Sequence, residues 1–126
     1  MAKLVTLEFY PGPYTFCAGH FTVFSKEQRE RLHGHNYSLA ATVTAAMREP
    51  GLTFNYKIFK ERLKSLCDEI NCYFLLPKHC PYLTIDEEGS YYYVTFNQEK
   101  IPFLKSDVVL LPIENTTLED LSQWFV

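Results

Sequence analysis

The chain has 126 residues, of which 47% are hydrophobic and 21% charged, and its formal net charge is −3. This length and apolar content suit one globular domain with a single core, so we expect one domain over residues 1–126. The low charge and the lack of a basic cluster argue against a dedicated binder of nucleic acid or anionic membranes. No run of 18 apolar residues occurs, and residues 1–14 do not read as a signal peptide, so we expect a cytoplasmic protein.

Strand patterns dominate the first part of the chain. Residues 3–9 and 14–24 are rich in β-branched and aromatic residues, and the sequence PGP at 11–13 separates them with a turn. Gly19 is a candidate β-bulge in the second of these strands. Residues 33–45 alternate between apolar and polar positions, which predicts a third strand with one apolar face. We expect the second and third strands to pair antiparallel through the loop between them.

The rest of the chain predicts helices and further strands. Residues 55–71 place apolar side chains on one stripe with charges opposite, which is typical of an amphipathic helix of about four turns. Residues 82–96 predict a hairpin around the sequence DEEGS, and residues 107–113 form a short apolar segment. Thr116 and Glu119 fit the S/T-x-x-E capping box, so we expect a second helix to open there. The sequence stops at Val126, before that helix has a C-terminal cap.

Three of the four histidines lie close together in the sequence. His33 and His35 are two residues apart on a predicted strand, so their side chains project from the same face and can grip one metal ion. His20, on the preceding predicted strand, is the candidate third ligand. Three neutral imidazoles leave the fourth position of a zinc ion open, as in catalytic sites. An H-x-H pair is also common among surface or structural histidines, which is the alternative. His79 lies in a Pro-flanked loop and is interpreted as structural or surface-exposed.

Several motifs occur in an order known from one family. They are FCAGHF (16–21), LHGHNY (32–37), FLLP (74–77) and TTLEDLSQW (116–124). Over roughly residues 5–126 the chain resembles the 6-pyruvoyltetrahydropterin synthase and 6-carboxytetrahydropterin synthase family. The resemblance implies an α+β tunnelling fold (T-fold), with an antiparallel sheet, helices on one face and a homo-oligomer with active sites between subunits. It also implies Zn²⁺ bound by His20, His33 and His35, and a pterin substrate, 7,8-dihydroneopterin triphosphate.

Two glutamates have places in the family pattern. The sequence RERLHGHNY resembles the type III subgroup, which uses a glutamate as base, and this implies that Glu30 is the catalytic base. The reaction implied is side-chain cleavage to 6-hydroxymethyl-7,8-dihydropterin, a folate precursor. Taken alone, Glu30 between Arg29 and Arg31 reads as a solvated loop carboxylate. Glu119 falls where the family places an acidic residue near the pterin, and it is equally the capping partner of Thr116.

Other positions depart from the family pattern. The usual Asp-His relay is replaced by Asn71 and Cys72, so Cys72 is a candidate relay residue, with packing as the alternative reading. Asn55 stands near a position where the family has an acidic residue. The family's final two strands have no counterpart after Val126, so we expect that strand pair to be missing.

The main functional prediction is therefore a zinc-dependent lyase of this family that acts on 7,8-dihydroneopterin triphosphate, by side-chain cleavage or phosphate elimination, in pterin or folate biosynthesis. One alternative is a 6-carboxytetrahydropterin synthase of queuosine biosynthesis, although the chain lacks the expected cysteine before the H-G-H motif. The other alternative is a catalytically degenerate homologue that binds zinc, with or without pterin, and has no turnover.

Overall fold

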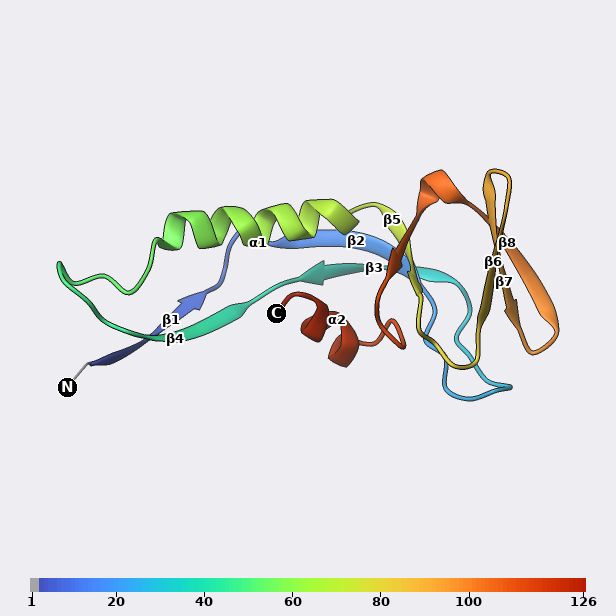
Figure 1. Ribbon diagram of the computed structural model, residues 1–126, viewed down its shortest axis with the longest axis horizontal. Helices are drawn as coiled ribbons and strands as arrows, with labels where there is room; N and C mark the ends of the chain where they lie inside the picture. Colours follow the sequence, from blue (N-terminus) through green and yellow to red (C-terminus); the bar gives the residue numbers. More distant parts are fainter. Residues whose placement is uncertain (1–2) are drawn as a thin grey trace. The chain divides into compact units, whose positions relative to one another are not determined.

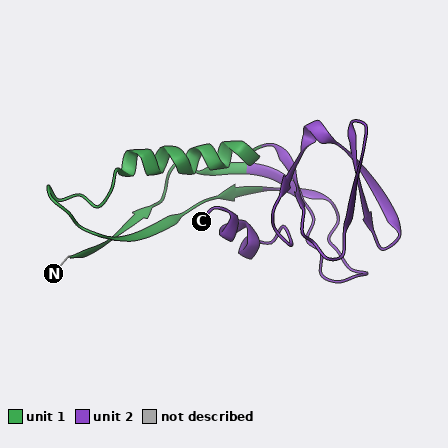
Figure 2. Cartoon of the chain, viewed as in Figure 1, with its two compact units in different colours: residues 1–16, 36–71 green, residues 17–35, 72–126 purple. Residues whose placement is uncertain are grey.

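The computed structural model describes residues 3–126, which separate into two compact units (Figure 2). Unit 1 contains the residues up to 16 together with 36–71, and unit 2 contains 17–35 and 72–126. The boundaries fall inside β2 (Thr15–His20) and β3 (His33–Ser38), so each of these strands contributes to both units. The mixture of separate sheets and helices along the chain confirms the predicted α+β class (Figure 1).

Unit 1 combines a pair of strands with one long helix. β1 (Leu4–Phe9) and β4 (Ala41–Ala46) pair antiparallel along their whole length. α1 (Tyr56–Ile70) matches the predicted amphipathic helix. It contacts β1 through the rings of Phe9 and Phe59, whose centroids are 4.6 Å apart.

Asn55 has a structural role at the start of α1. Its side-chain Oδ1 accepts hydrogen bonds from the backbone N–H groups of Lys57 and Ile58 at 3.2 and 3.4 Å. These N–H groups have no partner within the helix, so a polar N-cap residue stabilises it. This position therefore caps the helix, whatever residue the family carries there.

The predicted strand over residues 33–45 is two strands in the structure. β3 lies beside β2, whereas β4 pairs with β1, and the intervening Leu39 donates its N–H to Tyr14 O at 2.7 Å. Alternation of apolar and polar residues continues across the break because both halves are pleated. It therefore does not reveal that the two halves have different partner strands.

Unit 2 holds most of the four-stranded sheet, in which the strand order is β3-β2-β5-β9. β5 (Tyr73–Pro77) runs parallel to β2, and β9 (Val108–Leu111) runs parallel to β5. Parallel neighbours require long crossover connections, and here the chain between β2 and β5 includes α1. β2 and β3 are neighbours in this sheet, which brings the segment carrying His20 next to the segment carrying His33 and His35.

A second sheet of unit 2 is antiparallel, with strand order β6-β7-β8. The strands are β6 (Thr84–Glu88), β7 (Tyr91–Phe96) and β8 (Glu99–Leu104). The hairpin predicted over 82–96 is confirmed as β6 and β7, and β8 extends it. The turn before β8 places Asn97 and Gln98 at φ values of 47° and 68°, and left-handed residues of this kind suit a two-residue hairpin turn.

The core of unit 2 lies against the second sheet and the segment that follows β2. Its buried members are Phe21, Val23, Leu76, Cys80, Val94, Phe96 and Val108. Residues 21–24 were predicted to continue the second strand. They leave the regular strand at His20 but keep Phe21 and Val23 buried in this core.

The end of the chain forms a 3-10 turn, η1 (Lys105–Asp107), the strand β9 and the helix α2 (Leu118–Trp124). The N-cap of α2 is Thr117, whose hydroxyl accepts the N–H of Asp120 at 3.2 Å. The prediction that Thr116 and Glu119 form the capping box is therefore wrong by one residue. Thr116 does not act as the cap because its hydroxyl donates a hydrogen bond to the buried carbonyl oxygen of Phe21. No helix within residues 3–126 has the length and apolar character needed to cross a membrane.

Candidate metal centre

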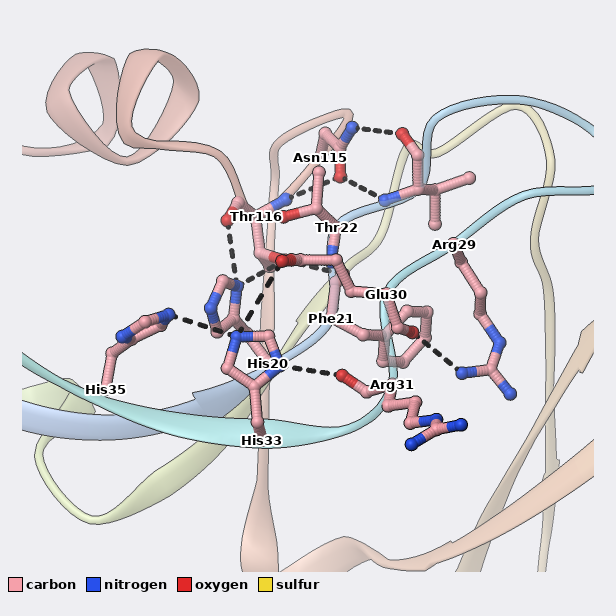
Figure 3. Close-up of polar contacts among 11 residues, drawn as sticks. His20, Phe21, Thr22, Arg29, Glu30, Arg31, His33, His35, Asn115 and Thr116 are labelled. Atoms are coloured by element: carbon pink, nitrogen blue, oxygen red, sulfur yellow. Dashed lines mark hydrogen bonds and ion pairs between the residues drawn. The ribbon is translucent and has the colours of Figure 1, made fainter.

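Three imidazole rings from two neighbouring strands converge in unit 2 (Figure 3). β2 carries His20 at its last position, and β3 carries His33 and His35 on one face. The ring centroids are 4.6 Å apart for His20–His33, 5.0 Å for His20–His35 and 4.7 Å for His33–His35. One ring nitrogen from each residue lies within 4.8 Å of the others, so the three side chains can hold one metal ion.

His20 is buried, and its orientation is set by Thr116. The Nδ1 atom of His20 lies 3.0 Å from the carbonyl oxygen of Thr116 and 3.2 Å from its hydroxyl oxygen. A carbonyl can only accept a hydrogen bond, so Nδ1 carries the proton. Nε2 of the neutral ring then presents its lone pair, as a metal ligand must.

His33 is oriented in the same way by a backbone carbonyl. Its Nδ1 donates to Arg31 O at 2.7 Å, which again leaves Nε2 as the lone-pair nitrogen. This Nε2 lies 3.0 Å from Nε2 of His35. Two ring nitrogens that both present lone pairs repel each other at this distance unless a proton lies between them. A metal cation bound to both nitrogens would take the place of that proton.

The arrangement fits a tetrahedral metal ion. With metal–nitrogen bonds of 2.0–2.1 Å, two ligands of a tetrahedral zinc are about 3.3 Å apart. The 3.0 Å separation in the His33–His35 pair is close to that value, and the third nitrogen lies no more than 4.8 Å from the other two. Carbonyl partners on Nδ1 are the usual outer contacts of metal-ligating histidines. The donor set and the orientation of its rings therefore match a three-histidine site.

The pKa of His20 is lowered from its ordinary value. The largest cause is burial, which penalises the charged imidazolium, and the neighbouring His33 and His35 lower it further. The hydrogen bond to the Thr116 backbone and the charge of Glu30 act in the opposite direction. The net effect favours the neutral ring, which is the form that binds a metal ion.

Glu30 lies beside this cluster, held by the backbone of Thr22. Its Oε1 accepts the Thr22 N–H at 3.0 Å, and its own N–H donates to Thr22 O at 2.8 Å. The other carboxylate oxygen, Oε2, lies 4.0 Å from Nε2 of His33. Hydrogen bonding from the Thr22 side chain is the largest cause that lowers the pKa of Glu30, while burial acts against it. Glu30 is therefore an ionised carboxylate at neutral pH, placed to accept a proton near the three rings.

Arg29 supports the position of Glu30 from the other side. Its guanidinium lies over the rings of Phe21 and Phe96, 5.3 and 5.7 Å from their centroids. It also donates to the carbonyl oxygen of Glu30 at 2.8 Å. Stacking on aromatic faces and a fixed donor geometry are typical of a structural arginine. Glu30 is a partly exposed loop carboxylate, as its neighbours in the sequence suggest, but its hydrogen bonds to Thr22 fix its position.

Cys72, Glu119 and His79, which the sequence also singled out, lie outside the histidine cluster. Cys72 directly precedes β5, is exposed, and donates its backbone N–H to Cys17 O at 2.6 Å. Glu119 is exposed in the first turn of α2. His79, interpreted as structural or surface-exposed, is exposed and donates its backbone N–H to Ile113 O at 3.0 Å. Within residues 3–126 the cluster of side chains that could hold a metal ion consists of His20, His33 and His35, and it includes none of these three residues.

Sequence reasoning missed the residues that orient the site, above all Thr116 and Asn115. Thr116 was interpreted only as a helix cap, and Asn115 was given no role. The pair Thr116–Thr117 before α2 offered a signal, because one helix needs a single N-cap residue and the second threonine needs another role.

The fold and the converging imidazoles define an α+β protein with a cluster of three histidines that could hold a metal ion. The family model described as 6-pyruvoyl tetrahydropterin synthase matches residues 13–126. The chain belongs to this family, as its motifs predict.

Relatives of known name agree with this assignment. A protein of Methanocaldococcus jannaschii, provisionally named as a 6-carboxy-5,6,7,8-tetrahydropterin synthase, is 30% identical over 112 residues, which are 87% of this chain and 68% of the relative. A Pyrococcus horikoshii protein with the same provisional name is 24% identical over 87% of this chain and 66% of its own length. The chain thus spans about two thirds of the length of these curated relatives.

Solved structures share the fold. The 6-pyruvoyl tetrahydropterin synthase of Plasmodium vivax aligns with a TM-score of 0.90 and 27% identity, over 98% of this chain and 76% of that chain. The Plasmodium falciparum protein aligns with a TM-score of 0.86 and 26% identity, over 98% and 75%. A further P. vivax structure, with a TM-score of 0.89 and 26% identity over 97% and 75%, is of a variant whose glutamate, described as a catalytic residue, is replaced by alanine.

Proposed function

We propose that the chain is a zinc-dependent pterin lyase that cleaves the side chain of 7,8-dihydroneopterin triphosphate, in a route to folate-type pterins. The observation that carries this proposal is the convergence of three imidazoles with a carboxylate oxygen 4.0 Å from one of them. Membership of the 6-pyruvoyl tetrahydropterin synthase family supplies the substrate class. In this proposal, residues 1–126 act as one pterin-synthase-like domain within a homo-oligomer.

His20, His33 and His35 are the proposed zinc ligands. A zinc ion held by these three imidazoles would keep one coordination position open for a substrate oxygen, and it would polarise that oxygen and make its hydroxyl more acidic. The backbone orients two of these rings. The carbonyl oxygen of Thr116 holds the His20 ring and that of Arg31 holds the His33 ring, so that each Nε2 is available as a ligand atom. The exposure of His35 leaves this side of the cluster accessible to solutes.

Glu30 is the proposed base. Its Oε1 is held by the Thr22 N–H, and Oε2 on the side of His33 accepts the proton from a substrate side-chain hydroxyl. Its lowered pKa keeps it ionised, as a base requires at neutral pH, and proton transfer by a positioned group contributes typically 10²–10⁴-fold. The P. vivax variant with its catalytic glutamate replaced supports a glutamate in this role. Cys72 as a relay residue and Glu119 as a substrate contact remain proposals on the family pattern.

A second candidate function is 6-carboxytetrahydropterin synthesis, as in queuosine biosynthesis. It is favoured by the provisional names of the M. jannaschii and P. horikoshii relatives. Both candidate reactions use the same metal site and the same substrate, so the product distinguishes them.

The test starts from metal content and ends with the product. Purified protein should contain about one zinc ion per chain, and the His33→Ala variant should lose it. Incubation of the zinc-loaded protein with 7,8-dihydroneopterin triphosphate should give 6-hydroxymethyl-7,8-dihydropterin by chromatography and mass spectrometry. Formation of 6-carboxytetrahydropterin would instead establish the second candidate.

Glu30→Gln provides the matched control for catalysis. The carboxamide oxygen can still accept the Thr22 N–H, so the variant should keep zinc but lose about 10²- to 10⁴-fold in turnover. Full activity of Glu30→Gln would refute the assignment of the base. Stoichiometric zinc without any turnover in the wild-type protein would refute the lyase and indicate a binding protein.

A further inference from the structure

Thr116 reaches the metal centre from the loop that precedes α2, and only 1% of its surface is exposed. Its hydroxyl donates to Phe21 O at 2.9 Å. A hydroxyl has a single proton, so the same oxygen can only accept from His20 Nδ1, which lies 3.2 Å away. The backbone carbonyl of Thr116, 3.0 Å from that Nδ1, also only accepts. Both oxygens of Thr116 therefore require the proton on Nδ1 and the lone pair on Nε2.

Asn115 fastens this loop to the segment that follows β2 (Figure 3). Its side-chain Nδ2 donates to Val23 O at 2.7 Å, and its Oδ1 accepts from Val23 N–H at 3.1 Å. The same Oδ1 accepts from Thr116 N–H at 3.0 Å. The backbone N–H of Asn115 in turn donates to Asp120 Oδ2 at 3.0 Å, which links the loop to the first turn of α2.

The segment fastened in this way, residues 20–23, also holds the candidate base. His20 at its start is the buried metal ligand, and Thr22 binds Glu30 through both its N–H and its carbonyl. A shift of residues 20–23 therefore moves the ligand and the carboxylate together. Polar groups that make several bonds in the interior rigidify a site when each group is satisfied.

We propose that Thr116 is a positioning residue that fixes the tautomer and direction of His20, and that Asn115 holds Thr116 in place for this task. The proposal deepens the proposed function, on which it rests for the nature of the bound ion. Neither residue is required to touch the ion or the substrate. Outer contacts of metal-ligating histidines typically contribute 10–100-fold to metal affinity, which sets the expected size of the effect.

The experiment measures metal affinity of the metal-free protein, without any assay of turnover. Co²⁺ is titrated and followed by its visible absorption bands, and Zn²⁺ affinity is obtained by competition with a chromogenic chelator. Thr116→Val keeps the backbone carbonyl and the shape but removes the hydroxyl, and should bind about 10-fold more weakly. Thr116→Ser keeps the hydroxyl and should bind within about twofold of the wild type. Asn115→Ala should lose about 10- to 100-fold.

Asn55→Ala is the matched control for general destabilisation. It also removes a carboxamide that bonds two groups of the backbone, but at the N-cap of α1, and should leave metal affinity unchanged. Equal affinity of Thr116→Val and wild type, or an equal loss in Asn55→Ala, would overturn the proposal.

The tautomer of His20 gives a second readout that needs no metal. Imidazole ¹⁵N spectra of the metal-free wild-type protein should show the proton of His20 on Nδ1, and Asn115→Ala should show a mixture of tautomers. A proton on Nε2 in the wild type would overturn the proposal even if every variant binds metal. If the predicted order of affinities holds while the pterin is not converted, the proposed function fails and this inference stands.

Discussion

Replacing Gly19 by alanine should destabilise the strand that carries His20. Gly19 is in register with Phe74 of β5, and its φ is outside the left-handed region, so alanine suits the backbone there. A β-carbon at this position, however, would lie 2.5 Å from Cδ2 and 3.1 Å from Cε2 of the Phe74 ring. The close approach of an aromatic ring thus gives a steric reason for glycine at this position.

The size of the effect follows from how far the ring must move. Ordinary contacts of a β-carbon begin near 3.4 Å, so Phe74 would have to retreat by about 0.9 Å. The rings of Phe103 and Phe21 stand near it, at centroid distances of 4.7 and 6.1 Å. Overpacking of this kind costs about 1–3 kcal/mol, and the lower entropy of the unfolded alanine chain offsets about 0.4–1 kcal/mol. The difference between these terms is about 0–2.6 kcal/mol. Because Phe103 and Phe21 stand near the ring, we expect a net loss in the upper part of this range, about 1–2.6 kcal/mol, in the free energy of unfolding.

Gly34→Ala is the matched control, because it is also a strand glycine but its β-carbon would meet Ala18 O at an ordinary 3.8 Å. Urea denaturation of both variants and the wild type, followed by circular dichroism, measures the difference. Gly34→Ala has no steric cost, so it should be as stable as the wild type or up to about 1 kcal/mol more stable. A Gly19→Ala variant as stable as Gly34→Ala would refute the steric reasoning. Phe74→Leu in the Gly19→Ala background should recover part of the loss, since leucine lacks the ring edge.

Two further outcomes test the site and the core. The metal-free protein should lose stability as the pH falls below about 6.5, because the pKa of His20 is lowered and the unfolded chain therefore takes up a proton at this residue before the folded protein does. Denaturation at pH 7.5 and 5.5 should show a smaller decrease for His20→Gln, and an equal decrease would contradict this cause. Leu76→Ala, at a fully buried position, should lose about 2–5 kcal/mol. Leu118→Ala, at a side chain 68% exposed, should change stability by less than about 0.5 kcal/mol in the same urea titration, and similar losses would contradict the assigned core.

Much of the candidate site could be predicted because its signals are local. The two-residue spacing of His33 and His35 puts their rings on one strand face wherever that strand lies. The resemblance to the family added His20 and Glu30 to the predicted site. In the structure the His20 ring and the Glu30 carboxylate lie beside His33 and His35. The amphipathic period over residues 55–71 likewise predicted α1, which spans Tyr56–Ile70.

The residues that orient the site could not be predicted in the same way. His20 and Thr116 are 96 positions apart, and Asn115 and Val23 are 92 positions apart. Hydrogen bonds between residues so far apart in the sequence depend on the tertiary fold, and a single sequence has no periodic pattern that predicts them. The capping-box pattern predicted Thr116 as the N-cap of α2. In the structure the Thr116 hydroxyl donates to Phe21 O, and Thr117 is the N-cap.

The sequence by itself determined that strands form near β1 and β2, that residues 82–96 form a hairpin, that α1 forms over residues 55–71, and which histidines can share one metal ion. These properties depend on side chains a few residues apart, where the 2.0 and 3.6 periods of regular structure act directly. Only the tertiary structure decided that residues 33–46 split between two sheets, that Gly19 makes room for an aromatic ring, and that Thr116 fixes the tautomer of His20. Each of these depends on a partner far along the chain, whose position is set by the packing of the whole unit.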